Sequence, residues 1–112
     1  RKYIKNDVHY ILSKKKWKTV VTHNPDGEYG HTHHQMTSYI VSKDSRVDMN
    51  QLVYFGKYYR KKNMPHNLNS ISQSDLEKKM KLTNMYSSQS KVMDHLGHML
   101  PHENWVKAKD WR

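Results

Sequence analysis

The sequence predicts an α+β fold in which an N-terminal β-hairpin or small antiparallel sheet precedes an irregular middle, a long C-terminal amphipathic helix and an extended tail. β-Branched and aromatic residues cluster near the N-terminus, Asn, Ser and Pro crowd the middle, and an apolar stripe at helical spacing follows. A chain of 112 residues is one domain's worth. We therefore expect a single small domain with a hairpin and turn region (1–42), a variable middle and loop (43–73), and a helix and tail (74–112).

The first two expected strands are "VHYIL" (8–12) and "WKTVVT" (17–22), which are rich in β-branched and aromatic residues. The segment between them, "SKKK", is short and polar, so the pattern predicts a hairpin with lysines at its tip. The following "HNPDG" predicts a chain reversal, because Pro25 presets one turn dihedral and Gly27 tolerates a positive φ.

The middle of the chain contains short apolar runs followed by a polar segment. "SYIVS" predicts a short strand at 39–42, whereas 48–60 is compatible with either helix or strand, since brief apolar runs do not reveal their period. The "KKNMPHNLNSIS" that follows has the composition of a loop or linker.

The last third predicts a helix. Ser74 and Glu77 fit a capping box, and an apolar stripe continues to Pro101, which ends it. The stripe consists of Val92, Met93, Leu96, Met99 and Leu100. Whether 75–100 is one helix or two hinged near "SSQS" stays open. Trp105 and Trp111 are expected to anchor the tail, because large aromatic side chains seldom lie free at a terminus.

Positive charge is the strongest global signal. The 20 Lys and Arg outnumber the 10 Asp and Glu by +10, and two blocks hold the whole excess. Residues 1–18 carry seven basic groups and one acid, a net +6, and residues 57–62 carry four basic groups, a net +4. Clustered cations of this kind bind polyanions by releasing counterions. The residues expected to contact phosphate are Lys14, Lys15, Lys16, Lys18, Arg60, Lys61 and Lys62.

Composition excludes several function classes. The chain has no Cys, so disulfides and thiolate metal sites are excluded. No apolar run approaches the roughly 18–20 residues that span a bilayer, and no grouped glycines form a phosphate-binding loop. We therefore expect neither a membrane span nor a small-molecule substrate. Only 35% of the residues are apolar and the mean hydropathy is −1.08, so one small core, stabilised partly by a partner, is expected.

Nine histidines raise the question of a metal site. His31, His33 and His34 form one group, and His95, His98 and His102 recur at helical spacing, although Pro101 interrupts the second series. Zinc needs three or four ligands held together, and nothing in the sequence brings the two groups together. We therefore expect neither a metal nor any other cofactor.

An enzymatic alternative is a metal-dependent single-stranded DNA nicking domain of the HUH relaxase type. Such proteins place a His-hydrophobic-His pair on a strand to hold a metal, and a later Tyr attacks phosphate. Here "HTH" precedes "KYYRKK", so Tyr58 or Tyr59 would be the nucleophile. Thr32 departs from the apolar residue expected between the ligands. The favoured interpretation is accordingly not an enzyme.

Basic blocks interleaved with aromatic residues favour RNA instead: "KKKWK", "YFGKYYRKK" and "WVKAKDWR". Lysine and arginine would neutralise phosphates while exposed rings stack on bases. For Trp17, Tyr54 and Phe55 the simpler expectation is that they form the small core.

The stretch "VHYILSKKKWKTVVTHNPDGEYGHT", with "DLEKKM" and "MDHLGHMLPHENW" further on, resembles the mitochondrion-specific large-subunit ribosomal protein family numbered forty-two. The matching positions are Val8, Leu12, Thr19, Val20, Val21, Pro25, Tyr29, Thr32, Met93, Leu96, Met99 and Trp105. The family's His-Pro is Asn24-Pro25 here, and 40–70 has no counterpart. The resemblance implies a non-catalytic component of the mitochondrial ribosome, located in the matrix, that contacts ribosomal RNA and neighbouring ribosomal proteins. An accessory subunit of another mitochondrial complex, without RNA contact, is a further alternative.

Overall fold

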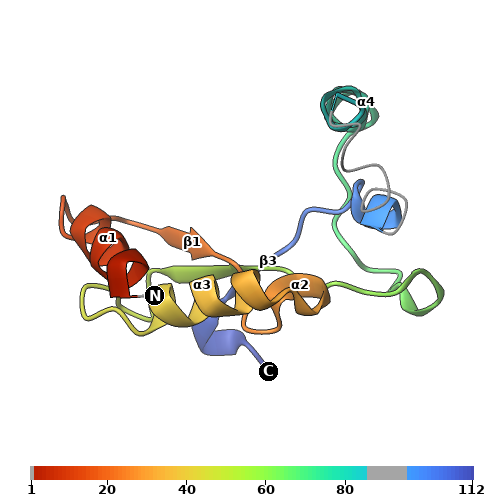
Figure 1. Cartoon of the computed structure of the whole chain (residues 1–112). Coiled ribbons are helices and arrows are strands. Elements are labelled where there is room, and N and C mark those ends of the chain that lie inside the picture. Colours follow the sequence, from red (N-terminus) through yellow and green to blue (C-terminus); the bar gives the residue numbers. More distant parts are fainter. Residues whose placement is uncertain (1, 86–95) are drawn as a thin grey trace. The chain divides into compact units, whose positions relative to one another are not determined.

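A computed structural model of the chain describes residues 2–85 and 96–112 (Figure 1). The chain divides into two compact units. Unit 1 comprises Arg1–Lys57 with Trp105–Arg112, and unit 2 comprises Tyr58–Asn104. Each unit is described by itself, and the expected single domain stays a prediction.

The elements follow one another in an order that mixes helices with short strands. They are α1 (Lys2–Leu12), β1 (Val20–Thr22), α2 (Gly27–Gly30), α3 (Thr32–Ser42), β2 (Leu52–Phe55), the 3₁₀ turn η1 (Lys61–Asn63), α4 (Gln73–Thr83), η3 (Gly97–Met99), β3 (Trp105–Lys107) and η4 (Ala108–Asp110). The fold is α+β, but its arrangement differs from the expected one.

The expected N-terminal hairpin is wrong, because its first strand is the C-terminal half of helix α1. Val8 and Leu12 are four residues apart, so a helix brings both to one face, where Val8 packs against the core and Leu12 is only 8% exposed. The helix end is also satisfied locally. The hydroxyl of Ser13 donates to the carbonyl of His9, and the indole N–H of Trp17 donates to that of Ile11.

The sheet of unit 1 has three strands in the order β1-β2-β3. It is mixed and not antiparallel as expected: β1 pairs with β2 in parallel, with Val20 opposite Leu52, and β2 pairs with β3 in antiparallel fashion, with Tyr54 opposite Val106. A parallel pair needs a crossover rather than a hairpin, and the segment from α2 through α3 supplies it. The segment 48–60, left open by the sequence, contains strand β2.

The expected strand at 39–42 is wrong, because these residues end helix α3. Ile40 and Val41 are both buried while Tyr39 is 64% exposed. Two adjacent buried residues do not fit the alternation of a half-exposed strand, but they fit one side of a helix. The Ser42 hydroxyl lies 2.8 Å from the hydroxyl of Tyr54, which ties the end of α3 to β2.

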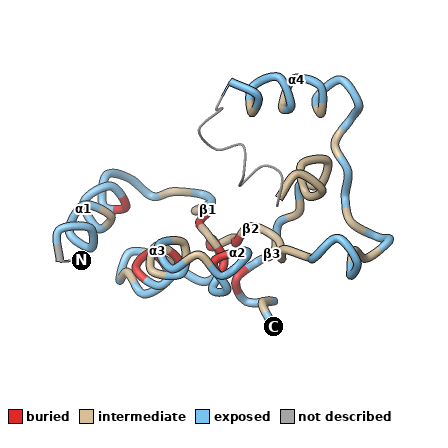
Figure 2. Tube along the Cα trace, turned by 45° about the vertical axis from the view of Figure 1, so that its right-hand side comes forward, coloured by how far each residue is buried: buried red, intermediate tan, exposed pale blue. Residues whose placement is uncertain are grey.

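The core of unit 1 is small. Val41, Leu52, Tyr54 and Ala108 form it, drawn from α3, β2 and η4 (Figure 2). Its size agrees with the low apolar content of the sequence. Of the three aromatic residues expected in the core, Tyr54 is confirmed, whereas Trp17 and Phe55 are half-buried and lie outside this cluster.

Unit 2 contains α4, which begins close to the predicted position. Its N-cap is Ser72, whose hydroxyl accepts a hydrogen bond from the backbone N–H of Asp75, so the capping serine is two residues earlier than predicted. The helix ends at Thr83, and no described residue of it is buried. Residues 97–99 form a 3₁₀ turn, so the structure shows no long C-terminal helix over the part of the chain that it describes. Val92 and Met93 lie outside the described residues.

The expected extended tail is also wrong, because residues 105–110 return to unit 1 as β3 and η4. The two tail tryptophans pack on neighbouring aromatic rings of β2. The ring of Trp105 lies 5.4 Å from that of Phe55, and the ring of Trp111 lies 5.7 Å from that of Tyr54. Both therefore serve as the anchors that the sequence predicted.

Candidate functional site

A cleft in unit 1 gathers one of the two predicted basic blocks. Its volume is about 570 Å³, and its lining comes from the loop after α1 and from the loop between α3 and β2. The lining residues are Leu12, Lys15, Lys16, Trp17, Lys18, Ser45, Arg46, Asp48, Asn50 and Gln51. This volume lies within the range of about 300–1,000 Å³ typical of small-ligand pockets, enough for a nucleotide-sized group.

The cleft is held in shape by Gln51. Its amide nitrogen donates to the backbone carbonyl of Trp17 at 2.7 Å, and its amide oxygen accepts from the backbone N–H of Asp48 at 2.7 Å. One side chain thus joins the two loops that line the cleft. The backbone bond from Val20 to the carbonyl of Gln51 continues this connection into the sheet.

The lysines of the first block are exposed, and two of them lie over aromatic rings. The Nζ atom of Lys14 is 4.2 Å from the centre of the Tyr10 ring, and that of Lys15 is 4.3 Å from the Trp17 ring. These cation–π contacts favour particular side-chain positions without neutralising the charge. Among the ion pairs between described residues, none involves Lys15, Lys16 or Lys18, so their charges face solvent.

Arg46 was not singled out from the sequence, although it lines the same cleft. In the sequence Arg46 lies between Asp44 and Asp48, in "KDSRVD", so this segment has no excess of positive charge. In the structure one of those acids, Asp44, accepts hydrogen bonds from the backbone N–H of Arg46 and from the imidazole of His9. Asp44 is therefore occupied elsewhere, and the guanidinium group of Arg46 remains exposed.

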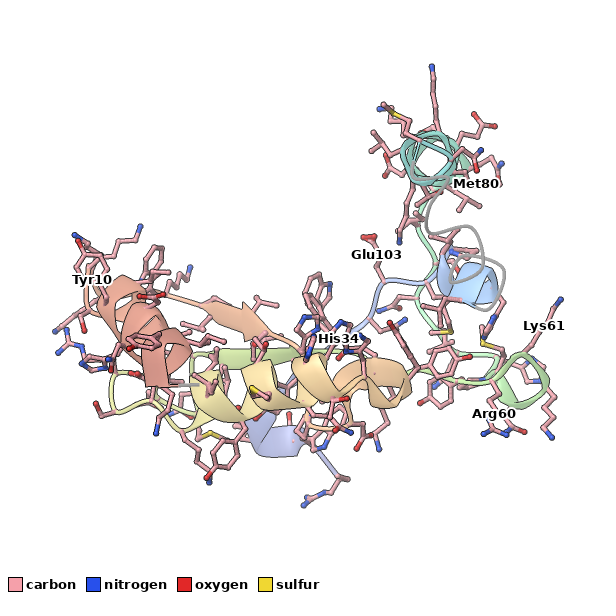
Figure 3. The ribbon with its side chains drawn as sticks, in the orientation of Figure 1. Tyr10, His34, Arg60, Lys61, Met80 and Glu103 are labelled. Atoms are coloured by element: carbon pink, nitrogen blue, oxygen red, sulfur yellow. The ribbon has the colours of Figure 1, made fainter. Side chains whose placement is uncertain are left out.

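The second basic block, Arg60, Lys61 and Lys62, belongs to unit 2, at the 3₁₀ turn η1 and its N-cap. All three residues are exposed, and Figure 3 shows the side chains of Arg60 and Lys61 pointing away from the ribbon. The residues that line the cleft all belong to unit 1.

The histidine segment forms a turn, as predicted, but with a set of contacts that the sequence did not reveal. The backbone N–H of Gly27 donates to the carbonyl of Asn24, which closes the reversal at Pro25. His23 and His34 then approach the carboxylate of Glu28: the Nδ1 atom of each lies 2.6 Å and 2.9 Å, respectively, from the same oxygen, Oε1. Their rings stack with centroids 3.9 Å apart.

Asn24 holds this cluster on the sheet and has no exposed surface. Its backbone N–H donates to Glu28 Oε2, and its side-chain oxygen accepts from the backbone N–H of Glu28, both at 2.9 Å. Its amide nitrogen donates to the carbonyls of Phe55 and Gly56 at 3.1 Å. Every polar group of this buried side chain is thus satisfied, as burial requires.

Glu28 adopts φ 58° and ψ −88°, the one positive-φ conformation among the described non-glycine residues. This is close to the rare, strained γ-turn region, and a residue held there costs on the order of 1–3 kcal/mol. The surrounding hydrogen bonds maintain the strain, and its effect is to direct the carboxylate at the two imidazoles.

Burial lowers the pKa of His34 from its ordinary value of 6.5, and the nearby His23 lowers it further, while Glu28 opposes the shift. The neutral imidazole is therefore favoured at position 34 near neutral pH. Figure 3 labels His34 near the start of α3.

The remaining candidate histidines do not join this cluster. His31 caps α3, with its Nδ1 accepting from the backbone N–H of His33. In unit 2, His98 contacts the carbonyl of Tyr59 and His102 contacts the hydroxyl of Ser70. His95 lies outside the described residues. Within the described ranges, His23, Glu28 and His34 are the one group of three or more potential metal ligands.

The nicking hypothesis required His31 and His33 on a strand, and the structure places them at the start of helix α3 instead. Tyr58 and Tyr59 are half-buried residues at the beginning of unit 2. The strand placement on which that hypothesis depends is therefore not found, and the activity itself stays untested.

Across residues 2–85 and 96–112, no helix has both the length and the apolar character needed to cross a bilayer.

Comparison with known proteins finds a viral relative. The chain is 29% identical over 109 residues to an uncharacterized protein of Acanthamoeba polyphaga mimivirus. The aligned region covers 97% of this chain and 43% of that protein. The chain thus spans less than half the length of its relative. No protein family matches the chain, and no solved structure matches it.

Proposed function

We propose that this protein binds RNA without catalysing a reaction, and that the basic cleft of unit 1 is the contact surface. The observation that carries the proposal is that Lys15, Lys16, Lys18 and Arg46 line one cleft together with the half-buried Trp17. Cationic groups beside an aromatic ring are the combination that tracks a sugar-phosphate backbone while a base stacks.

The charge distribution supports a polyanion in preference to a small anion. The cleft is open to solvent on a surface where Lys14 is also exposed, and the whole chain carries +10. A single phosphate would need only one or two of these groups. A strand that continues beyond the cleft would meet the others, and release of its counterions would supply the affinity.

More specifically, the RNA would be ribosomal RNA of the large subunit of the mitochondrial ribosome, in the matrix, as the family resemblance implies. A protein neighbour fits the outer face of α1, where Tyr3 and Tyr10, seven residues apart, are 80% and 62% exposed. Exposed aromatic side chains of this size are frequent anchors of protein interfaces.

An equilibrium titration of labelled single-stranded RNA with the full chain tests the binding. The variant K15Q/K16Q/K18Q removes three cleft charges, and we expect its affinity to fall about tenfold or more. The matched control is K78Q/K81Q/K109Q, which loses the same charge at exposed positions that are not part of the cleft lining. An equal loss of affinity in both variants would show that net charge alone, and not this cleft, binds RNA.

Cofractionation of the native protein with mitochondrial ribosomal RNA, before and after nuclease treatment, tests the setting. The proposal predicts that the protein sediments with the large subunit and is released when the RNA is digested. Sedimentation with a large assembly that nuclease leaves unchanged would support the accessory-subunit alternative and would contradict the RNA contact.

A further inference from the structure

The side chains of His23, Glu28 and His34 converge on one point of unit 1. Their donor atoms, two imidazole nitrogens and a carboxylate oxygen, all lie within 4.8 Å of one another. The three residues come from different segments: His23 follows β1, Glu28 lies in α2, and His34 is in the first turn of α3. The convergence is therefore a product of the fold and not of adjacent positions in the sequence.

The hydrogen bonds of the cluster meet at one carboxylate oxygen of Glu28. Both imidazoles direct Nδ1 at one and the same oxygen, Oε1, while the other oxygen of Glu28 accepts from the backbone of Asn24. Two N–H groups thus share a single acceptor, and the two rings that carry them are stacked. Glu28 adopts its strained backbone conformation to present that oxygen.

We propose that His23, Glu28 and His34 form a binding site for a divalent transition-metal ion of the zinc type, coordinated by Nδ1 of each histidine and Oε1 of the glutamate. Two imidazoles and one carboxylate are a donor set that zinc uses at sites with three protein ligands, where a fourth position stays open for water or a ligand. Magnesium and calcium prefer oxygen donors throughout, so two nitrogens select against them.

The three side chains rearrange locally to accept the ion. Zinc lies about 2.0–2.2 Å from nitrogen and oxygen ligands, so the ligand atoms of a tetrahedral site are about 3.3–3.5 Å apart. The nitrogen-to-oxygen distances here are 2.6 and 2.9 Å, so the carboxylate withdraws by less than an ångström. The two rings are nearly parallel, with 9° between their planes, so they also tilt until both Nδ1 lone pairs point at the ion. When it coordinates the ion through Nδ1, each imidazole would carry its proton on Nε2.

The surroundings supply the support that metal ligands normally have. Asn24 fixes the second oxygen of Glu28, and carboxylate ligands are commonly held by such a bond. The ring of His31 stacks on that of His34 with centroids 4.4 Å apart, which restricts the ring orientation. The three side chains are 31%, 18% and 26% exposed for His23, Glu28 and His34, so an ion can enter from solvent.

Calorimetric titration of the EDTA-treated full chain with Zn²⁺, at neutral pH, tests the site. We expect one equivalent of Zn²⁺ to bind, and Co²⁺ to give the visible absorption of a four-coordinate ion. E28Q keeps the shape of the side chain and its bond from Asn24 but removes the charge, and we expect at least a tenfold weaker affinity. H23Q and H34Q should behave in the same way.

The matched control is H33Q, which removes an exposed neighbouring histidine outside the cluster. Its affinity should equal that of the wild type. If E28Q fails to fold by circular dichroism, H23Q decides the matter, because His23 contributes no bond to the backbone in the cluster. Equal Zn²⁺ binding by wild type, E28Q and H23Q, or loss only in H33Q, would overturn the proposal and assign the ion to other surface histidines.

Nitrogen NMR of the histidine rings provides an independent readout. With Zn²⁺ bound, the imidazoles of His23 and His34 should carry their proton on Nε2, while that of His33 is unchanged. Protonation of His23 and His34 at Nδ1 in the presence of saturating Zn²⁺ would contradict the proposed coordination.

Discussion

The backbone N–H groups of Asn24 and Glu28 each donate to a side-chain oxygen of the other residue, which locks the turn between them. The same Asn24 side chain bonds the end of β2. The turn, the end of the central strand and the His23–Glu28–His34 cluster therefore depend on one fully buried amide.

Replacing Asn24 with alanine should destabilise the protein by about 2–4 kcal/mol, because several buried backbone groups lose their partner at once. Urea denaturation, monitored by circular dichroism, measures the change in the free energy of unfolding. Asn6→Ala is the control: Asn6 is exposed on α1, and alanine is the better helix former, so stability should change by less than about 0.5 kcal/mol. Similar values for the two variants would show that the Asn24 bonds contribute little.

Gly27 has φ +69°, and a Cβ atom there would lie 2.7 Å from Cγ and 3.2 Å from the backbone nitrogen of Gln35. Gly27→Ala should therefore cost about 1–3 kcal/mol, through both the backbone conformation and the close approach of α3. Gly97→Ala has open space around the new atom and no positive φ, and it should be neutral or slightly stabilising. Thermal unfolding of the two variants checks this; a harmless Gly27→Ala would contradict the packing of α2 on α3.

The lowered pKa of His34 predicts a pH-dependent stability. The unfolded state, with the ordinary value of 6.5, takes up a proton before the folded state does. The stabilisation of the folded state that His34 contributes is therefore complete above about pH 6.5. It decreases as the pH falls from there to the pKa of His34 in the folded state, and below that pKa it no longer changes. Denaturation of wild type and His34→Gln between pH 5 and 8 measures the difference.

His34→Gln removes this group, so the stability difference between the two proteins should change with pH only below about pH 6.5. A constant difference across the range would show that His34 has an ordinary pKa. His33→Gln, at an exposed neighbouring position, leaves His34 in place and should retain the pH dependence that His34 contributes.

The C-terminal segment stabilises unit 1 through Trp111. Its ring contacts Tyr54, packs against the core, and lies 5.0 Å from the Nζ atom of Lys57. Trp111→Ala should cost about 2–4 kcal/mol, because a partly buried aromatic side chain is removed from the core edge. Trp105→Ala should cost less, since Trp105 is 56% exposed. Chemical denaturation ranks the two, and the opposite order would contradict the packing described.

The parts of the fold predicted from sequence are those with local causes. The turn at Pro25 and Gly27 follows from backbone preferences, and the start of α4 follows from a serine cap, misplaced by two residues because Ser72 and Ser74 both fit. The helices α1 and α3 were missed because their β-branched and aromatic residues favour strands locally. Tertiary packing of Val8, Leu12 and Val41 overrides that preference.

The candidate sites show the same division. The lysines of the cleft were visible as a charge block, but Arg46 joins them only through the fold. His23 fell within the predicted turn and Glu28 was not singled out, because their relation to His34 depends on the strained conformation of Glu28 and the position of α3. A His and a Glu five residues apart do not match a known metal-ligand motif, so their spacing alone did not predict a site.

The central claim is that the cleft lysines lie against a sugar-phosphate backbone, and the salt dependence of RNA binding tests it most directly. For wild type, the logarithm of the binding constant should fall linearly with the logarithm of salt concentration, and K15Q/K16Q/K18Q should reduce that slope by about 2, given about 0.7 per contact with single strands. K78Q/K81Q/K109Q should leave the slope unchanged. A wild-type binding constant that is flat with salt, or equal slopes for wild type and the cleft variant, would contradict the account.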